Sequence, residues 1–267
     1  MKVLWTLVRR TLGRAAGILA SVATLFALFQ IALVAIAAAL NDAGGFSQLA
    51  SLAPAFIVQL MGPALTTFAG MTSLSFFEPL IVMVLVLLAI YLAAEPAGDV
   101  ESELVDLLLA RPLGRHVIVT RTLIVMTAAV LVLPAAMGLS LWAGLHTLAP
   151  PGVVWPRTST VILLMAHLTA VSWCFGGAAL AAGAWARRRG QAQSVVGVAA
   201  VALYLMEFVG EAWPRQIWLA RVSPFHHFHG PSLLAGQTDP VRDLAILITV
   251  GAIGAGLAYW QFQRRDV

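Results

Sequence analysis

The sequence predicts an all-α, polytopic membrane protein with six transmembrane helices, an amphipathic interfacial helix at the N-terminus and short interfacial helices on the outer side. Hydrophobic residues make up 60% of the 267 residues and charged residues only 10%, whereas charged residues reach about 25% in soluble domains. The apolar stretches are continuous, unlike the alternating strands of an outer-membrane barrel. Because a helix satisfies its own backbone hydrogen bonds in lipid, these stretches indicate helical spans.

Residues 1–14 are predicted to form the interfacial helix, because Val3, Leu7 and Val8 gather near one face while Arg9 and Arg10 lie mostly off it. A basic amphipathic helix before a span lies along the cytoplasmic surface, attracted to anionic lipid. The alternative is that the first span simply begins early.

Six stretches meet the requirement of about 20 apolar residues for a span. They cover approximately residues 15–40, 74–94, 117–145, 158–185, 194–209 and 244–262. Between them, residues 41–73 and 210–243 combine apolar pieces with prolines, and we expect short helices that lie on or dip into the outer leaflet.

Basic residues predict the orientation, since cytoplasmic loops are enriched in Lys and Arg. Placing both termini in the cytoplasm puts all but four of the 16 basic residues inside. The four outer ones are Arg157, Arg215, Arg221 and Arg242. We therefore expect a multi-pass protein of the cell (inner) membrane. The net charge of +4 is explained by basic cytoplasmic loops, which set the topology, rather than by nucleic-acid binding.

The connection between the second and third spans, residues 95–116, is the most charged segment of the chain. Five of the 12 acidic residues lie between Glu95 and Asp106, and arginines follow at 111, 115 and 121. Early acids and late arginines suit a short helix over about residues 100–109, whose dipole they complement. That helix can be a solvated loop element or a docking element for a soluble partner.

Ionisable residues within or near the spans are candidate polar sites, because charge at membrane depth is costly. These are Glu78, His167 and Glu207, for which interfacial placement or a helix–helix hydrogen bond is the simpler interpretation. His226, His227 and His229 could be metal ligands, but no neighbouring Cys or cluster of carboxylates completes a site, and packing is the simpler reading. No catalytic, cofactor-binding or metal-binding residues are predicted.

Three motifs carry a family resemblance. Residues 103–115 read E-L-V-D-L-L-L-A-R-P-L-G-R after Glu95 at the end of the second span, residues 222–228 read V-S-P-F-H-H-F, and the chain ends F-Q-R-R-D-V. In this order they resemble the permeases of type-2 ABC transporters, which typically read G-T-L-E-L-L-L-A-R-P-x-S-R, L-S-P-F-x-Y-F and F-x-R-R-D-Φ. Glu103-Leu104 and Gly114 depart from the first pattern.

The resemblance implies a single permease domain over residues 1–267 that belongs to an ATP-driven exporter. The implied partners are a second permease copy in a homodimer, a cytoplasmic ABC ATPase that binds ATP and Mg²⁺, and membrane lipid. The chain has no phosphate-binding loop of its own, and so is expected to be neither an enzyme nor a cofactor-binding protein. The residues expected to contact the ATPase are Glu95, Asp99, Glu101, Glu103, Asp106, Arg111 and Arg115.

A mechanotransmission subunit that drives an outer-side partner protein is the alternative function. An intramembrane enzyme is disfavoured by the absence of catalytic motifs.

Overall fold

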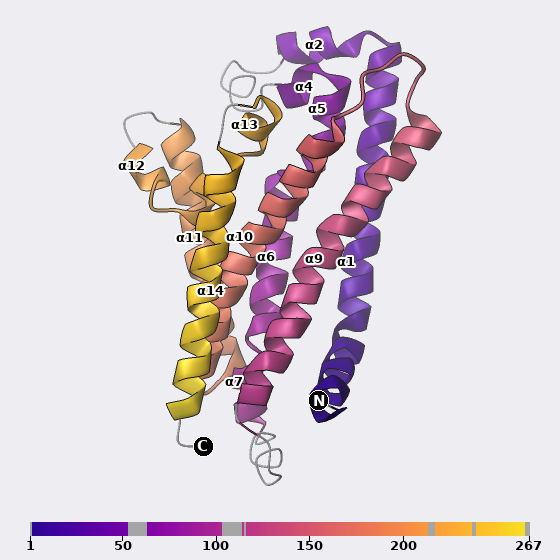
Figure 1. Cartoon of the computed structure of the whole chain (residues 1–267). Coiled ribbons are helices and arrows are strands. Elements are labelled where there is room, and N and C mark those ends of the chain that lie inside the picture. Colours follow the sequence, from indigo (N-terminus) through magenta and orange to yellow (C-terminus); the bar gives the residue numbers. More distant parts are fainter. Residues whose placement is uncertain are drawn as a thin grey trace.

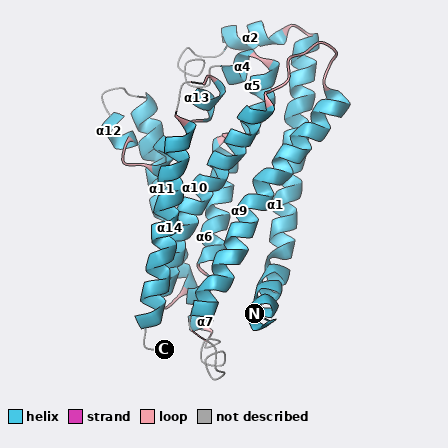
Figure 2. Cartoon of the chain, viewed as in Figure 1, coloured by secondary structure: helices cyan, strands magenta, loops and turns pink. Residues whose placement is uncertain are grey.

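The computed structural model describes residues 2–52, 63–102, 114, 116–212, 217–236 and 239–264, and every regular element within them is a helix (Figure 2). Six helical stretches are long and apolar enough to cross a membrane. They are α1 (Lys2–Asp42), α5 to α6 (Phe68–Ala93), α9 (His116–Leu148), α10 (Thr158–Trp185), α11 (Arg189–Ala212) and α14 (Pro240–Arg264). The predicted all-α, polytopic architecture with six spans is confirmed.

The bundle has two distinct ends (Figure 1). The α7 end holds the start of α1, the short helix α7 (Glu95–Glu101) and the last turn of α14. The opposite end, called the α13 end here, holds the other short helices. These are α2 (Gly45–Leu52), α4 (Pro63–Thr66), α5 (Phe68–Ser73), η1 (Leu74–Phe76), α12 (Ile217–Ala220), η3 (Pro224–His227) and α13 (Gly230–Leu234). The predicted short helices of the two long connections are therefore present.

Helix α10 is the centre of the bundle, because it packs against α6, α9, α11 and α14. Its side chains are apolar around most of its circumference, and Leu164, Leu168 and Val171 are fully buried. A helix that is apolar on all sides belongs in an interior. Helix α1 lies outside this centre and packs mainly along α9.

Glycines let α10 and α14 approach backbone to backbone. A Cβ atom on Gly177 of α10 would lie 2.2 Å from the carbonyl oxygen of Gly251 in α14, and one on Gly254 would lie 2.5 Å from the carbonyl carbon of Gly177. Trp173 adds a hydrogen bond across the same interface, from its indole Nε1 to the carbonyl oxygen of Ile248 at 3.3 Å. Small residues allow such close packing of helices in membranes.

A buried polar contact fixes α1 to the start of the second span. Gln30 of α1 donates from Nε2 to the carbonyl oxygen of Thr72 at 2.8 Å, and the hydroxyl of Ser75 donates to Gln30 Oε1. All three residues are fully buried. Since a buried amide without partners is costly, these bonds specify how α1 meets α5 and η1.

The sequence predicted a second span that starts near residue 74. In the structure, this span is not one continuous helix from that residue. Helix α6 (Pro79–Ala93) begins five residues later, with Pro79 in its first turn and Glu78 as its N-cap. The Glu78 carboxylate accepts hydrogen bonds from the backbone N–H groups of Leu80 and Ile81 at 2.9 and 3.1 Å. A proline without an N–H and a capping carboxylate both favour a helix start at this point, and η1 and α5 complete the span.

Three other predicted boundaries also need correction. The predicted interfacial helix of residues 1–14 is not a separate element, because α1 continues without a break from Lys2 to Asp42. Helix α11 begins at Arg189, before the predicted start at residue 194. The first two residues of the helix predicted over residues 100–109 belong to the end of α7, which begins at Glu95 and ends at Glu101, and residues 103–113 lie outside the described part of the chain.

Candidate functional site

Ion pairs at the α7 end join α7 to two long helices. Glu95, in the first turn of α7, pairs with Arg14 of α1 at 3.0 Å and with Arg189 of α11 at 3.1 Å. The Glu95 side chain is largely buried, whereas Arg14 is more than half exposed. One carboxylate therefore connects the N-terminal part of α1 to the start of α11.

Arg189 makes further contacts with the same region. Its guanidinium donates from Nη2 to the carbonyl oxygen of Tyr91 at 3.0 Å and lies 4.3 Å from the centre of the Tyr91 ring. Its backbone N–H donates to Glu101 Oε2 at 2.9 Å. Stacking on an aromatic ring together with planar donors is typical of arginine at fixed interfaces. Both the first and last turns of α7 are thus held by the start of α11.

A buried ion pair attaches α7 to α9. Arg121 Nη2 lies 2.5 Å from Asp99 Oδ2, and the two side chains are 1% and 3% exposed. Burial raises the pKa of the Asp99 carboxyl above its ordinary value, although the Arg121 guanidinium acts in the opposite direction. Burial is therefore the larger influence on this carboxyl, and the attraction to Arg121 is the largest influence that opposes it.

Three of the seven residues predicted to contact an ATPase lie in the described part of the chain. Glu95, Asp99 and Glu101 all contact other residues of this chain, on α1, α9 and α11. The remaining four, Glu103, Asp106, Arg111 and Arg115, fall outside the described residues. Sequence reasoning missed the internal partners Arg14, Arg121 and Arg189, although the positive charge at three separate span ends was visible.

At the α13 end, a capped turn brings histidines against α11. Ser223 caps η3 by accepting a hydrogen bond from the backbone N–H of Phe225 at 3.1 Å, and Pro224 occupies the first turn. The Phe225 ring is buried between Phe175 of α10 and Tyr204 of α11, at ring-centre distances of 5.0 and 5.3 Å. The Ser-Pro-Phe sequence therefore anchors the turn and fixes where the following residues point.

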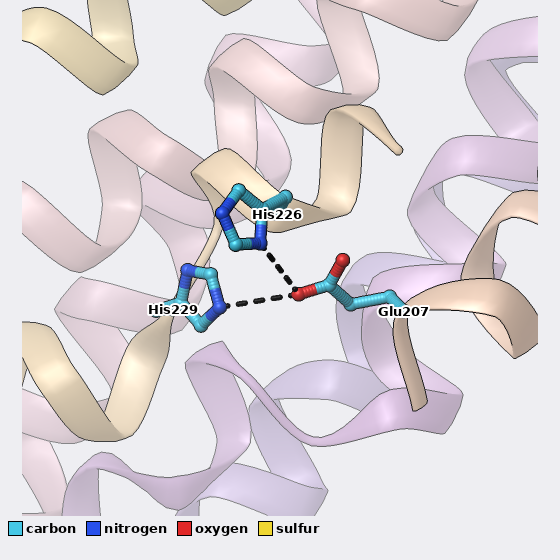
Figure 3. Close-up of side chains that lie close together, drawn as sticks. All are labelled: Glu207, His226 and His229. Carbon is cyan, nitrogen blue, oxygen red and sulfur yellow. Dashed lines mark hydrogen bonds and ion pairs between the residues drawn. The ribbon is translucent and has the colours of Figure 1, made fainter. Parts of the chain in front are cut away.

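The residues after this anchor meet the buried carboxylate of Glu207. His226 Nδ1 lies 3.3 Å from Glu207 Oε1, and His229 Nε2 lies 3.1 Å from the same oxygen (Figure 3). The rings of the two histidines are nearly perpendicular, with centres 5.1 Å apart. Glu207, predicted as an isolated polar residue of the fifth span, thus belongs to a cluster of three ionisable side chains.

His227 points to another helix. Its Nδ1 lies 2.8 Å from Asp243 Oδ1 in the first turn of α14. A cavity of about 470 Å³ opens beside both groups. It is lined by Arg221, His226, His227, His229, Ser232, Arg242 and Asp243. The cavity is therefore polar, with both basic and acidic side chains in its wall.

A second cavity, of about 450 Å³, shares His229 and Ser232 with the first and has a more apolar lining. Its aromatic residues are Phe77, Tyr204, Phe208, Phe225 and Phe228. Glu78 and Glu207 also line it, so its wall combines aromatic rings with two carboxylates.

His167 does not join the other predicted polar sites. It is buried in α10, where its Nδ1 lies 2.8 Å from the carbonyl oxygen of Leu163, one turn earlier in the helix. This bond within α10 gives one ring nitrogen a partner, so that nitrogen needs no contact with another helix. Glu78, as the N-cap of α6, likewise has a structural role that explains its position.

Comparison with known proteins gives one family. A protein-family model described as "Multidrug efflux system permease Rv1217c, C-terminal domain" matches residues 73–263. The match covers more than half of the chain and includes α7, α11, η3 and α14. No curated protein matches the chain significantly.

Proposed function

The chain belongs to the family described as the C-terminal domain of the multidrug efflux system permease Rv1217c, and we propose that it is the permease subunit of an ATP-driven exporter of the type-2 ABC class. It is a multi-pass membrane protein of a permease family, and transport rather than enzymatic chemistry is its role. ATP and Mg²⁺ would be bound by a separate cytoplasmic subunit. The protein would lie in the inner membrane of the cell, and its α7 end would face the cytoplasm.

The contacts of α7 are the observation that best supports coupling to such a partner. Only Ala94 separates α6 from α7, so a displacement of α7 acts directly on the second span. Ion pairs from Glu95 and Asp99 carry the same displacement to α1, α9 and α11. A partner that binds the segment after α7 could therefore move four long helices together, which alternating access requires.

The cargo we propose is lipophilic or amphipathic. The walls of the spans carry few charges, and the aromatic cavity at the α13 end has the apolar lining typical of small-molecule sites. Helices α1 and α11 also expose apolar side chains, among them Leu28 and Val198. In a membrane such faces meet lipid chains or another helix, and we propose that a second copy of the permease covers part of them.

Charge reversal at the end of α7 and in the segment that follows it is expected to uncouple transport from ATP hydrolysis. In Glu101→Lys/Glu103→Lys/Asp106→Lys, repulsion from the docking surface should abolish co-purification of the ATPase or leave ATP hydrolysis without cargo transport. The measurement is co-purification from membranes, followed by ATP-dependent uptake of a lipophilic dye into inside-out vesicles.

Glu101→Lys alone is the control, since it removes the contact between Glu101 and the backbone of Arg189 but leaves Glu103 and Asp106 unchanged. It should retain the ATPase partner and most of the transport. A triple variant that assembles and transports like the wild type would refute the coupling role of this segment. A wild-type complex that assembles and hydrolyses ATP but never transports the dye would instead favour mechanotransmission to an outer-side protein.

A further inference from the structure

We propose that Glu207, His226 and His229 form a binding site for a divalent transition-metal ion, with Zn²⁺ as the best-matched ion. The proposal does not depend on the function proposed above. It concerns two histidines that are neighbours in the chain, at η3 and the start of α13, and a carboxylate on α11 that only folding brings to them.

The donor set fits Zn²⁺. Two imidazole nitrogens and one carboxylate oxygen are the protein ligands of many zinc sites that keep a fourth position open. Calcium and magnesium prefer oxygen ligands alone, so the two histidines argue against them. Other first-row ions that accept imidazole remain chemically similar competitors.

The distances fit as well. The three donor atoms all lie within 4.8 Å of one another, and Glu207 Oε1 is 3.3 Å from His226 Nδ1 and 3.1 Å from His229 Nε2. Zinc–ligand bonds of about 2.0 Å in a tetrahedron place neighbouring ligand atoms about 3.3 Å apart. Two of the three ligand separations therefore already match, and small side-chain rotations rather than backbone movement would complete the site.

The buried carboxylate of Glu207 is only partly satisfied by hydrogen bonds from the described residues. Its side chain is 8% exposed, and its second oxygen, Oε2, is buried without a hydrogen-bond partner among the described residues. A buried carboxylate oxygen without a partner is costly and calls for an explanation. The proposed ligand atom is the other oxygen, Oε1, and a divalent ion bound to it would offset the buried negative charge of the whole carboxylate.

The polar cavity provides access and room for a fourth ligand. His226 and His229 both line it, so an ion can reach their nitrogens from the α13 end. Arg221 and Arg242 line the same cavity; their positive charge favours water or a small anion as the fourth ligand. His227 also lines the cavity but pairs with Asp243, which makes it the natural control.

The test uses the full-length purified chain, stripped of metal with a chelator and then titrated with Zn²⁺ against a chromophoric competitor. The wild type should bind one Zn²⁺ per chain, and Co²⁺ should give the intense visible absorption of a four-coordinate site. Glu207→Gln and His229→Ala should each weaken binding by more than the about 10–100-fold that loss of an outer-shell partner costs. His227→Ala should bind as the wild type does.

Glu207→Gln keeps the size and hydrogen-bonding capacity of the side chain, so its fold can be checked by gel filtration and by an unchanged helical spectrum. Wild-type protein that takes up no stoichiometric Zn²⁺ at micromolar concentration would overturn the proposal. Equal loss of binding in His227→Ala and His229→Ala would also overturn it, because the ion would then bind the histidine-rich turn nonspecifically.

Discussion

Replacing Asp99 with Asn is expected to lower the free energy of unfolding by about 3–5 kcal/mol, the range for breaking a buried ion pair from one side. The change removes the carboxylate that pairs with the Arg121 guanidinium, which is 1% exposed. Its Nε already lacks a partner among the described residues, and the neutral amide of Asn would be a weaker partner than the carboxylate. The measurement is the thermal unfolding of the purified protein in one detergent.

The double variant Asp99→Leu/Arg121→Met separates the cost of an unpaired charge from the value of the pair. It should recover most of the lost stability, because apolar residues can replace a buried ion pair at little cost. Arg14→Gln is a second control. Arg14 is 53% exposed and also pairs with an acid of α7, and its loss should cost about 1 kcal/mol or less. Equal effects of Asp99→Asn and Arg14→Gln would contradict the burial of the pair.

Adding one methyl group between α10 and α14 is expected to destabilise the bundle by about 1–3 kcal/mol, as for overpacking of a close-packed interior. In Gly254→Ala the new Cβ atom would lie 2.5–2.9 Å from backbone atoms of Gly177 and Ala178. Backbone atoms cannot rotate away as a flexible side chain can, so the two helices must separate. The same measurement of thermal unfolding applies.

Gly256→Ala is the matched control for this variant. It lies two residues further along α14, and a Cβ atom there meets nothing within 4 Å. Alanine should stabilise this site by about 0.5–1 kcal/mol through its greater helix propensity. Gly254→Ala that is as stable as Gly256→Ala would show that α10 and α14 do not meet at these glycines.

The spans could be predicted because each depends on a local property, the length and continuity of an apolar stretch. The start of α6 was missed by five residues although its signals were present, since Glu78-Pro79 is a capping residue followed by a proline suited to the first turn. Residues 1–14 form the first part of the continuous helix α1 rather than a separate element, and Gly13 is tolerated inside that helix.

The contacts of the two ends could not be predicted in the same way. Asp99 and Arg121 are 22 residues apart and belong to different helices, and nothing in their spacing indicates that they pair. Glu207 and His226 are separated by 19 residues and a change of chain direction. Their meeting depends on how deeply Phe225 packs between α10 and α11, which is a tertiary property. The prolines of residues 210–243 did indicate short helices there, but not which side chains would face one another.

The most direct test of an ATP-driven permease is transport by inside-out vesicles that contain this chain together with its co-expressed ATPase. A lipophilic dye should accumulate in the vesicles only when Mg·ATP is supplied, and vesicles containing either subunit alone should accumulate none. Dye accumulation by the chain alone, driven by an ion gradient and unaffected by ATP, would contradict the proposal that a partner ATPase drives transport.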